Sequence, residues 1–530
     1  MDAAAQPRGR VVPVLAVIAV AALLRLWNIG GQPVLYFDSG VYLGEGAFLA
    51  SAAERAAAAL VQPGTGGVLE RVARATEQGT DAHPPDIAKP GHAVLLALSM
   101  LVLGKSALAG ALVSAVAGVG TVVVTCALGV RGWNQRVGVA AALLLAVSGQ
   151  ALVYSREALV ESDGMFFAAL ASLVYLRARR ARALLLAGAV FGLAFACNNR
   201  LGYLPLVLLL VELGCWRGLG RFVRNGVALA AGFGAPLALI EVGYLIARAI
   251  GRLTSARTDW LDYVQQLAAF SRMNPPDRWR FDQWPTYWVD LALMDGLAVL
   301  GLLLVGLGVL AVHLGRRRGM ADVLLAASLL VPLALYSVYS TGEVRMRHFS
   351  LALPWVMLAA GLGLERLTRF SRWVLPSALG LLCVLAMPRA FSLINAPNGM
   401  PAVVAALPPG PVAGTNGPVL AFYVGEDRSN ARLREAFVNV PGDLNALAQR
   451  YPTLVVDMQA YVFPGELTRR YDAATPSLRV PHGTDAWYLA DLLEHYGVAW
   501  GGWDGLLATW DAERERATHV SVYNLGELTR

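Results

Sequence analysis

Apolar residues along this 530-residue chain fall into long runs that short polar segments separate. A helix needs about 20 apolar residues to cross a bilayer, and eleven runs have roughly that length. The predicted spans lie near residues 11–29, 106–130, 137–153, 158–176, 183–197, 201–215, 222–250, 287–314, 321–339, 349–364 and 374–391. The pattern therefore predicts a polytopic α-helical membrane protein.

Arginines are concentrated in alternate loops between these spans. The loops on one side carry most of them, whereas the short loops on the other side carry only Arg156, Arg200, Arg345 and Arg347. Loops on the cytoplasmic side of a membrane are rich in basic residues. We therefore predict a multi-pass protein of the cytoplasmic (inner) membrane, with its N-terminus on the cytoplasmic side. The outer side then receives a first loop at about 30–105, a loop at 251–286 and everything after residue 392.

One apolar segment, residues 91–103, is too short to count as a span. If it crossed the bilayer, every later arginine cluster would face outward. We therefore expect a re-entrant or juxtamembrane helix within the first outer loop.

The pattern of apolar residues changes near residue 396. Apolar runs become short and alternating, as in 453–457 and 519–523, and helical-looking stretches lie between them at 429–437 and 485–496. Short strands alternating with helices indicate an α/β fold. We predict a transmembrane domain at 1–395 and an extracytoplasmic α/β domain at 396–530, entered through the Pro/Gly-rich segment 407–411.

Composition narrows the function. The net charge of +7 comes mostly from loop arginines that set topology, so a nucleic-acid partner is not expected. The four cysteines lie inside or at the ends of apolar runs, which gives no disulfide framework or metal-binding spacing. Lys89 and Lys105 are the only lysines.

The predicted outer loops gather side chains suited to chemistry. Asp38, Tyr42 and Glu45 share one face if they are helical, and a carboxylate there would act as a general base on a hydroxyl. Cationic side chains that would hold a phosphate follow later in the chain, namely Lys89, Arg200, Arg347 and His348. The alternative for each residue alone is a paired or snorkelling anchor near the end of a span.

Taken together, these motifs resemble the GT-C superfamily of membrane glycosyltransferases, and are similar to bacterial relatives of protein O-mannosyltransferases and of lipid A aminoarabinose transferases. The motifs that carry the resemblance are Arg25–Ile29 leading to Asp38 and Tyr42, Lys89-Pro90, Tyr154–Arg156 with Glu161, Asn198–Arg200 before Pro205, and Arg347–Pro354.

The resemblance implies an inverting transfer of a sugar from a polyprenyl-phosphate donor to an acceptor hydroxyl on the outer face of the membrane. The acceptor, whether glycan, lipid or protein, is left open. The roles implied are catalytic for Asp38 and Glu161, donor-phosphate binding for Lys89, Arg200, Arg347 and His348, and substrate binding for Tyr42, Glu45 and Arg156.

The chain departs from the family pattern at several positions. Ser39 stands where a second acid often follows, and Gly91 stands where a second proline is usual. Glu161 replaces an aspartate, Arg200 replaces a lysine, and the first loop carries an insertion at 51–87.

Two further questions stay open at the level of sequence. A divalent metal between Asp38 and Glu161 is one option, although no histidine-rich ligand set accompanies them. A lipid or solute transporter, or flippase, is the rival function, and a catalytically inactive relative is a third. Ionisable residues gathered at one face, rather than near the midplane, favour the enzyme.

Overall fold

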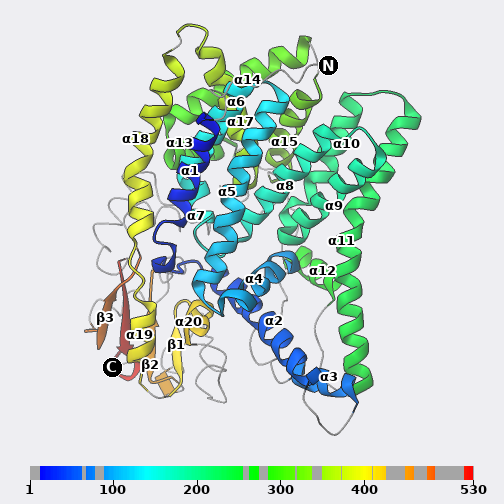
Figure 1. The fold of residues 1–530 in the computed structure, drawn as a ribbon. Helices are drawn as coiled ribbons and strands as arrows, with labels where there is room; N and C mark the ends of the chain where they lie inside the picture. The colour runs from blue at the N-terminus through cyan, green and yellow to red at the C-terminus, as the bar shows by residue number, and fades with distance from the viewer. Residues whose placement is uncertain are drawn as a thin grey trace.

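The structure, a computed structural model, is mostly helical, with a small sheet near the C-terminus (Figure 1). The residues it describes are 12–61, 67–77, 89–254, 262–273, 284–316, 319–336, 349–371, 373–408, 410–424, 448–449, 451–458, 474–483 and 518–528.

Each of the eleven predicted spans contains a helix. The helices within them are α1 (Val12–Leu26), α5 (Ala107–Gly132), α6 (Gln135–Val147), α7 (Gly149–Tyr154), α8 (Val160–Arg177), α9 (Ala181–Cys197), α10 (Leu204–Gly214), α11 (Leu219–Thr254), α13 (Trp284–Asp295), α14 (Leu297–Arg316), α15 (Met320–Tyr336), α17 (Leu353–Leu367) and α18 (Val374–Asn395). Within the described residues, six helical segments are long and apolar enough to cross a bilayer, and four shorter apolar helices accompany them.

The remaining elements lie in the connections and near the C-terminus. They are η2 (Ile29–Gly31), α2 (Phe37–Val61), α3 (Val68–Glu77), α4 (Pro90–Leu103), η3 (Asn199–Tyr203), α12 (Tyr263–Met273), η5 (Ser350–Ala352), α19 (Met400–Ala406), α20 (Gly417–Val424) and α26 (Leu525–Leu528). Helix α4 forms where a re-entrant or juxtamembrane helix was expected. Its 14 residues reach about 21 Å, less than the ~30 Å of a hydrocarbon core.

Two predicted spans are interrupted, because local backbone features override their continuous hydrophobicity. The first breaks at Ser148, whose Oγ accepts a hydrogen bond of 3.2 Å from the Ala151 amide and starts α7. The second breaks at Gly296, whose φ of +96° ends α13 before α14 begins.

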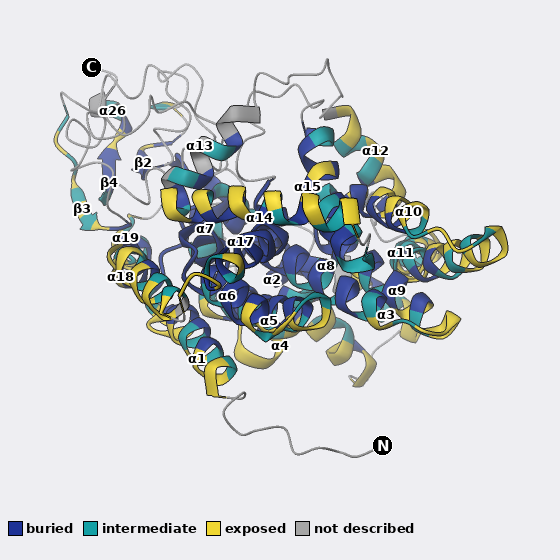
Figure 2. Ribbon diagram, turned by 90° about the horizontal axis from the view of Figure 1, so that it is seen from above, coloured by how far each residue is buried: buried dark blue, intermediate teal, exposed yellow. Residues whose placement is uncertain are grey.

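Burial follows the arrangement of a helical bundle in a membrane. Helices α6, α8 and α17 are buried at the centre, whereas α1, α11, α14 and α18 expose their outer sides (Figure 2). Large apolar side chains are exposed there, such as Leu239 on α11 and Val384 on α18. Apolar surface of this extent is typical of contact with lipid, which supports a multi-pass membrane location.

The strands form one mixed sheet in the order β1-β2-β4-β3, comprising β1 (Val412–Gly414), β2 (Thr453–Val456), β3 (Leu478–Pro481) and β4 (His519–Asn524). The pair β1–β2 is parallel and the other two pairs are antiparallel. The strands predicted at 453–457 and 519–523 are thereby confirmed as β2 and β4. The helices predicted at 429–437 and 485–496 lie outside the described residues.

The sheet region packs directly on the segment that joins α1 to α2 and on the start of α2. Valines of β1, β2 and β4 share a hydrophobic cluster with Leu35 and Tyr42, and Asn416 Nδ2 donates a 3.0 Å hydrogen bond to the Leu35 carbonyl. Helix α20 lies so close to α2 that a Cβ on Gly40 would stand 2.4 Å from the Val419 nitrogen. The C-terminal part of the chain therefore covers the start of α2.

The junction between sheet and bundle is expected to weaken in acid, because His482 is buried beside β3. Its Nδ1 accepts a 3.1 Å hydrogen bond from the Gly399 amide, and burial lowers the pKa of its imidazole from 6.5 to about 3. The neutral ring is therefore the stable form. The contribution of neutral His482 to the free energy of unfolding is fully present above pH 6.5 and is lost as the pH drops towards 3. The loss at pH 5 is about 2 kcal/mol.

Thermal unfolding at pH 7 and pH 5 measures this loss. His482→Asn keeps an acceptor for Gly399 but cannot be protonated, so its melting temperature should fall less between the two pH values. His519→Asn, at the half-buried neighbouring position on β4, is the matched control. Equal acid sensitivity in the wild type and His482→Asn would refute the prediction.

Candidate active site

The start of α2, which carries Asp38, is held by one buried carboxylate. Glu157 Oε2 accepts hydrogen bonds from the amides of Leu35 and Tyr36 at 3.2 and 3.4 Å and from Ser39 Oγ at 3.1 Å. Acceptors at a helix N-terminus satisfy amides that have no intrahelical partner, and a negative charge there is favourable. Asp38 itself is partly buried on the first turn.

The preceding residue, Arg156, holds the other side of the same loop. Its Nη1 donates to the carbonyls of Leu24, Arg25 and Trp27 at 2.9, 3.1 and 3.0 Å, and its Nε donates to Gln32 Oε1 at 3.0 Å. These carbonyls mark the end of α1, where a cation is favourable. Through these contacts Arg156 positions the end of α1 and the segment that follows it. The predicted binding of substrate by Arg156 stays a prediction.

Lys89 reaches the face of α2 that carries Asp38. Its ammonium lies 4.8 Å from the centroid of the Tyr42 ring and donates a hydrogen bond to the Tyr42 hydroxyl. Asp38 is one helical turn before Tyr42, so their Cβ atoms are about 6 Å apart. The predicted phosphate ligand, Lys89, therefore contacts α2 one turn after the predicted base, Asp38.

A buried histidine–aspartate pair lies next to Tyr42. The Tyr42 and His92 rings meet edge to face with centroids 5.1 Å apart, and His92 Nδ1 is 2.6 Å from Asp163 Oδ2. Both side chains are buried, as is Lys89. The pair links α2 and α4 to the first turn of α8 and fixes the orientation of the Tyr42 ring.

Glu161, also in the first turn of α8, pairs with Arg200 from η3. Arg200 Nη1 lies 3.1 Å from Glu161 Oε1, and the glutamate side chain is fully buried. The sequence assigned these two residues separate roles, in catalysis and in phosphate binding. The structure brings them together as one ion pair.

The departure at Gly91 has a steric reason. A Cβ at this position would lie 2.9 Å from the Ala196 carbonyl carbon and from the Cys197 nitrogen, at the end of α9. The close approach of α4 to α9 leaves no room for a larger residue. Lys89 and Pro90 therefore begin α4 tightly against α9.

The other predicted site residues are placed as follows. Glu45 is buried one turn beyond Tyr42, on the same side of α2. Arg347 and His348 lie outside the described residues. Among the described residues, no group of three or more His, Cys, Asp and Glu side chains is arranged to hold a metal ion.

The sequence also placed Glu157 and Asp163 among the polar residues of the outer face, but it assigned no role to either and did not single out His92. The structure shows Glu157 as an anchor and joins His92 to Asp163 as a pair. His92 follows Lys89 by three positions, which places both on one side of the first turn of α4. A histidine inside an otherwise apolar helix is the signal that would have found it.

Part of the chain matches a known protein family. The model of a family described as dolichyl-phosphate-mannose-protein mannosyltransferase matches residues 82–260, which include Lys89, Glu161 and Arg200. No curated protein matches the chain in sequence.

Solved structures match the chain over most of its length. ArnT from Cupriavidus metallidurans, bound to undecaprenyl phosphate, is 14% identical with a TM-score of 0.50, covering 91% of this chain and 97% of that one. The archaeal oligosaccharyltransferase AglB from Archaeoglobus fulgidus, in complex with an inhibitory peptide and a dolichol-phosphate, is 11% identical with a TM-score of 0.52, covering 98% and 88%.

These matches confirm the resemblance to the GT-C superfamily of membrane glycosyltransferases. At such low identity the structural likeness establishes the fold. Together with the family match it supports glycosyltransferase activity, as the sequence predicted.

The Glu161–Arg200 pair is expected to be strongly coupled. Removing one partner leaves the other charge buried, which typically costs about 3 kcal/mol. We expect Glu161→Gln and Arg200→Gln each to lower the free energy of unfolding by roughly this amount, and the double variant to lower it by clearly less than the sum. The free energy of unfolding is measured for the purified wild type, the two single variants and the double variant. A loss in the double variant equal to the sum of the two single losses would contradict the coupling between Glu161 and Arg200.

Glu157 is expected to be needed for the fold of the segment that leads into α2. Glu157→Ala removes a charged acceptor from three donors and should lower the free energy of unfolding by about 3 kcal/mol. Glu157→Gln, which keeps one acceptor oxygen, should have a smaller effect. Glu54→Ala removes an exposed acid from α2 and serves as control. Unfolding at the same temperature for Glu157→Ala and the wild type would disprove the anchoring role.

Proposed function

We propose that the protein transfers a sugar from a polyprenyl-phosphate donor to an acceptor hydroxyl, with inversion, on the outer face of the cytoplasmic membrane. The observation that carries the proposal is the approach of Lys89 to Tyr42, one turn from Asp38, where α2, α4 and α8 meet. The lipid phosphates bound in the ArnT and AglB structures support this donor class.

In the proposed reaction Asp38 is the general base. It accepts the proton of the acceptor hydroxyl as that oxygen attacks the anomeric carbon of the sugar. The bond between the anomeric carbon and the phosphate oxygen breaks in the same displacement, so the configuration inverts and polyprenyl phosphate leaves. A positioned base contributes roughly 10²–10⁴-fold to the rate.

Lys89 is the proposed ligand of the departing phosphate. Its ammonium would stabilise the negative charge that grows on the leaving oxygen. Arg200 is the second cation proposed for the donor, with its guanidinium oriented by Glu161. Arg347 and His348 keep the same proposed role. His92 and Asp163 act through Tyr42 by holding its ring beneath the Lys89 ammonium.

The buried site and the covering C-terminal segment suit an enzyme. Helix α20 packs on the start of α2, which would limit the access of water to Asp38. Exclusion of water suppresses hydrolysis of the donor and strengthens charge interactions. We propose that the acceptor approaches between this segment and the bundle.

The base role is tested by turnover of purified protein with a panel of polyprenyl-phosphate sugars, following the release of polyprenyl phosphate. Asp38→Asn should lower the turnover number about 10²–10⁴-fold on the one donor that the wild type uses. Lys89→Met should also lower turnover and weaken donor binding. Glu54→Gln, at an exposed acid on the same helix, should change neither.

Full turnover in Asp38→Asn would remove Asp38 from the role of base. Absence of release from every donor, combined with movement of labelled lipid across vesicles, would instead support the transporter.

A further inference from the structure

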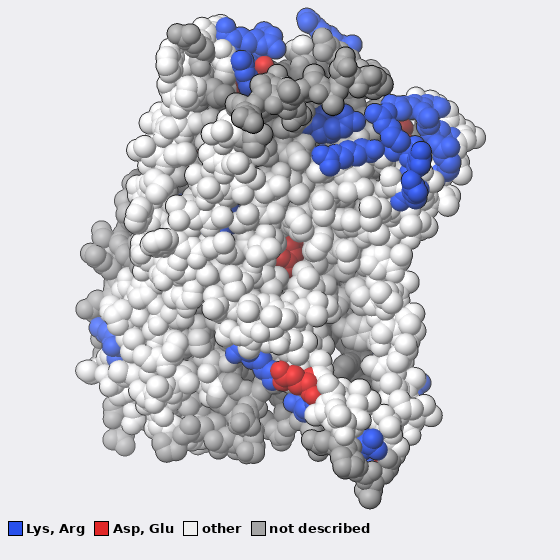
Figure 3. Space-filling view, viewed as in Figure 1, with Lys and Arg blue, Asp and Glu red and all other residues white. Residues whose placement is uncertain are grey.

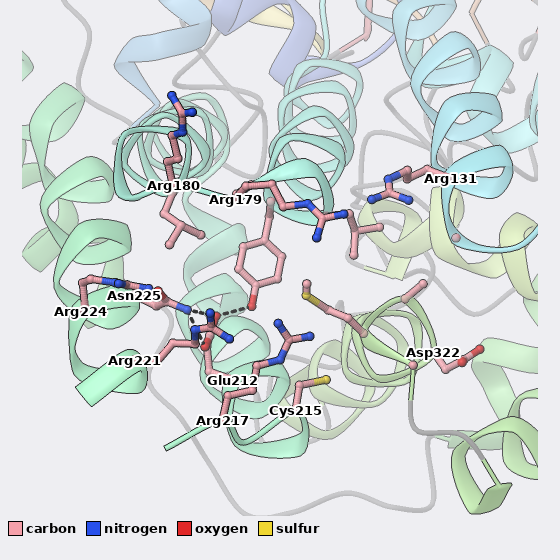
Figure 4. Close-up of a pocket in the computed structure, with 18 residues that line it drawn as sticks. Arg131, Arg179, Arg180, Glu212, Cys215, Arg217, Arg221, Arg224, Asn225 and Asp322 are labelled. Carbon is pink, nitrogen blue, oxygen red and sulfur yellow. Dashed lines mark hydrogen bonds between the residues drawn. The ribbon is translucent and has the colours of Figure 1, made fainter. Parts of the chain in front are cut away.

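Basic side chains gather at the end of the bundle that lies opposite the candidate active site (Figure 3). A cavity of about 400 Å³ opens there between the ends of α5, α8, α10, α11 and α15 (Figure 4). Helix α8 connects the two regions, because it carries Glu161 in its first turn and Tyr175 in its last. Fourteen residues at ~1.5 Å each separate them by about 21 Å.

Six arginines from different elements line this cavity. They are Arg131, Arg179, Arg180, Arg217, Arg221 and Arg224. Arg131 ends α5, two of the others lie between α8 and α9, and the remaining three surround the start of α11. The preference of basic residues for the cytoplasmic side explains why arginines occur in these loops. It does not explain why they line one common cavity.

The two acids that line the cavity have other partners. Glu212 accepts a 2.7 Å hydrogen bond from the Tyr175 hydroxyl and a 3.1 Å hydrogen bond from Asn225 Nδ2 (Figure 4). Asp322 accepts a 2.9 Å hydrogen bond from Trp133 Nε1 and lies 3.2 Å from His313 Nδ1. Within the described part of the chain, neither acid forms an ion pair with the six arginines. The cavity therefore keeps a strong positive charge.

The segment from the end of α10 to the start of α11, which carries Arg217, Arg221 and Arg224, also exposes apolar side chains. Leu213 at the end of α10 and Leu219 and Val223 at the start of α11 are exposed beside the arginines. Trp216 and Phe222 pack together between them, with ring centroids 5.4 Å apart. Aromatic and aliphatic side chains beside basic ones are typical of the level where lipid head groups meet acyl chains.

We infer that this cavity binds the phosphate head group of an anionic membrane lipid, with the acyl chains against α10 and α11. Guanidinium groups bind phosphate oxygens through paired hydrogen bonds, and basic pockets between transmembrane helices suit lipid phosphates. The exposed apolar side chains on the same segment as Arg217 and Arg221 favour a lipid over a free phosphate ion. The site is independent of the transfer reaction and does not rest on the proposed function.

The test compares full-length protein in nanodiscs of phosphatidylcholine with and without phosphatidylglycerol. The pocket variant carries Arg179→Gln, Arg217→Gln and Arg221→Gln together. The control variant carries Arg136→Gln, Arg316→Gln and Arg366→Gln, which removes the same charge from exposed positions outside the cavity. The readouts are the shift in melting temperature and the affinity for phosphatidylglycerol from lipid titration.

Phosphatidylglycerol should raise the melting temperature of the wild type and the control variant alike. The pocket variant should lose this shift and bind phosphatidylglycerol about a hundredfold more weakly. Its melting temperature in phosphatidylcholine alone should match that of the control variant, which shows that it folds.

Three outcomes would overturn the inference. One is an equal loss in both variants, which would mean that only overall surface charge matters. Another is an undiminished shift in the pocket variant. The third is an equal shift of the wild type with inorganic phosphate in phosphatidylcholine nanodiscs, which would assign the cavity to free phosphate.

Discussion

The position of the candidate base depends on two adjacent buried charges in the turn between α7 and α8. Arg156 binds the carbonyls at the end of α1, and Glu157 binds the amides at the start of α2. The segment between these helices is thus held at both sides by one short stretch of chain. Buried charges are costly unless they are fully hydrogen-bonded, and here backbone groups supply most of the partners. The rest of the site, including Asp38 and Tyr42, is built on this fixed start of α2.

From this anchor the site extends through side chains that connect different helices. Lys89 reaches Tyr42 from the start of α4, and His92 joins the same ring to Asp163 on α8. Glu161, two positions earlier on α8, binds Arg200. Because α8 contributes to both contacts, a shift of its first turn would disturb the lysine and the arginine together. The candidate site therefore consists of two sets of polar contacts that the first turn of α8 joins within an apolar bundle.

The sequence predicted the helices well because a hydrophobic run is formed by residues that are neighbours in the chain. It predicted β2 and β4 for the same reason, since the alternation of apolar and polar residues is also a pattern among neighbours. It did not predict the breaks at Ser148 and Gly296, where a cap or a positive φ interrupts a continuous apolar run. It identified Asp38, Lys89, Glu161 and Arg200 as candidates, but it did not predict the ion pair between Glu161 and Arg200. The contacts of Lys89 with Tyr42 and of His92 with Asp163 join residues far apart in sequence, so no local pattern reveals them.

The packing of α20 on α2 has a consequence for the timing of synthesis. Gly40 and Pro418 touch in the folded protein, yet they are separated by 378 residues of chain. At ~5–20 residues per second, a ribosome needs roughly 20–75 s between them. During that interval the start of α2 has no cover, and Leu35 lacks the hydrogen bond from Asn416. A chain that has been made only as far as the end of α18 at Asn395 already contains every predicted span, yet the start of α2 is still uncovered. The cover over Asp38 is therefore added after the helical bundle has been made.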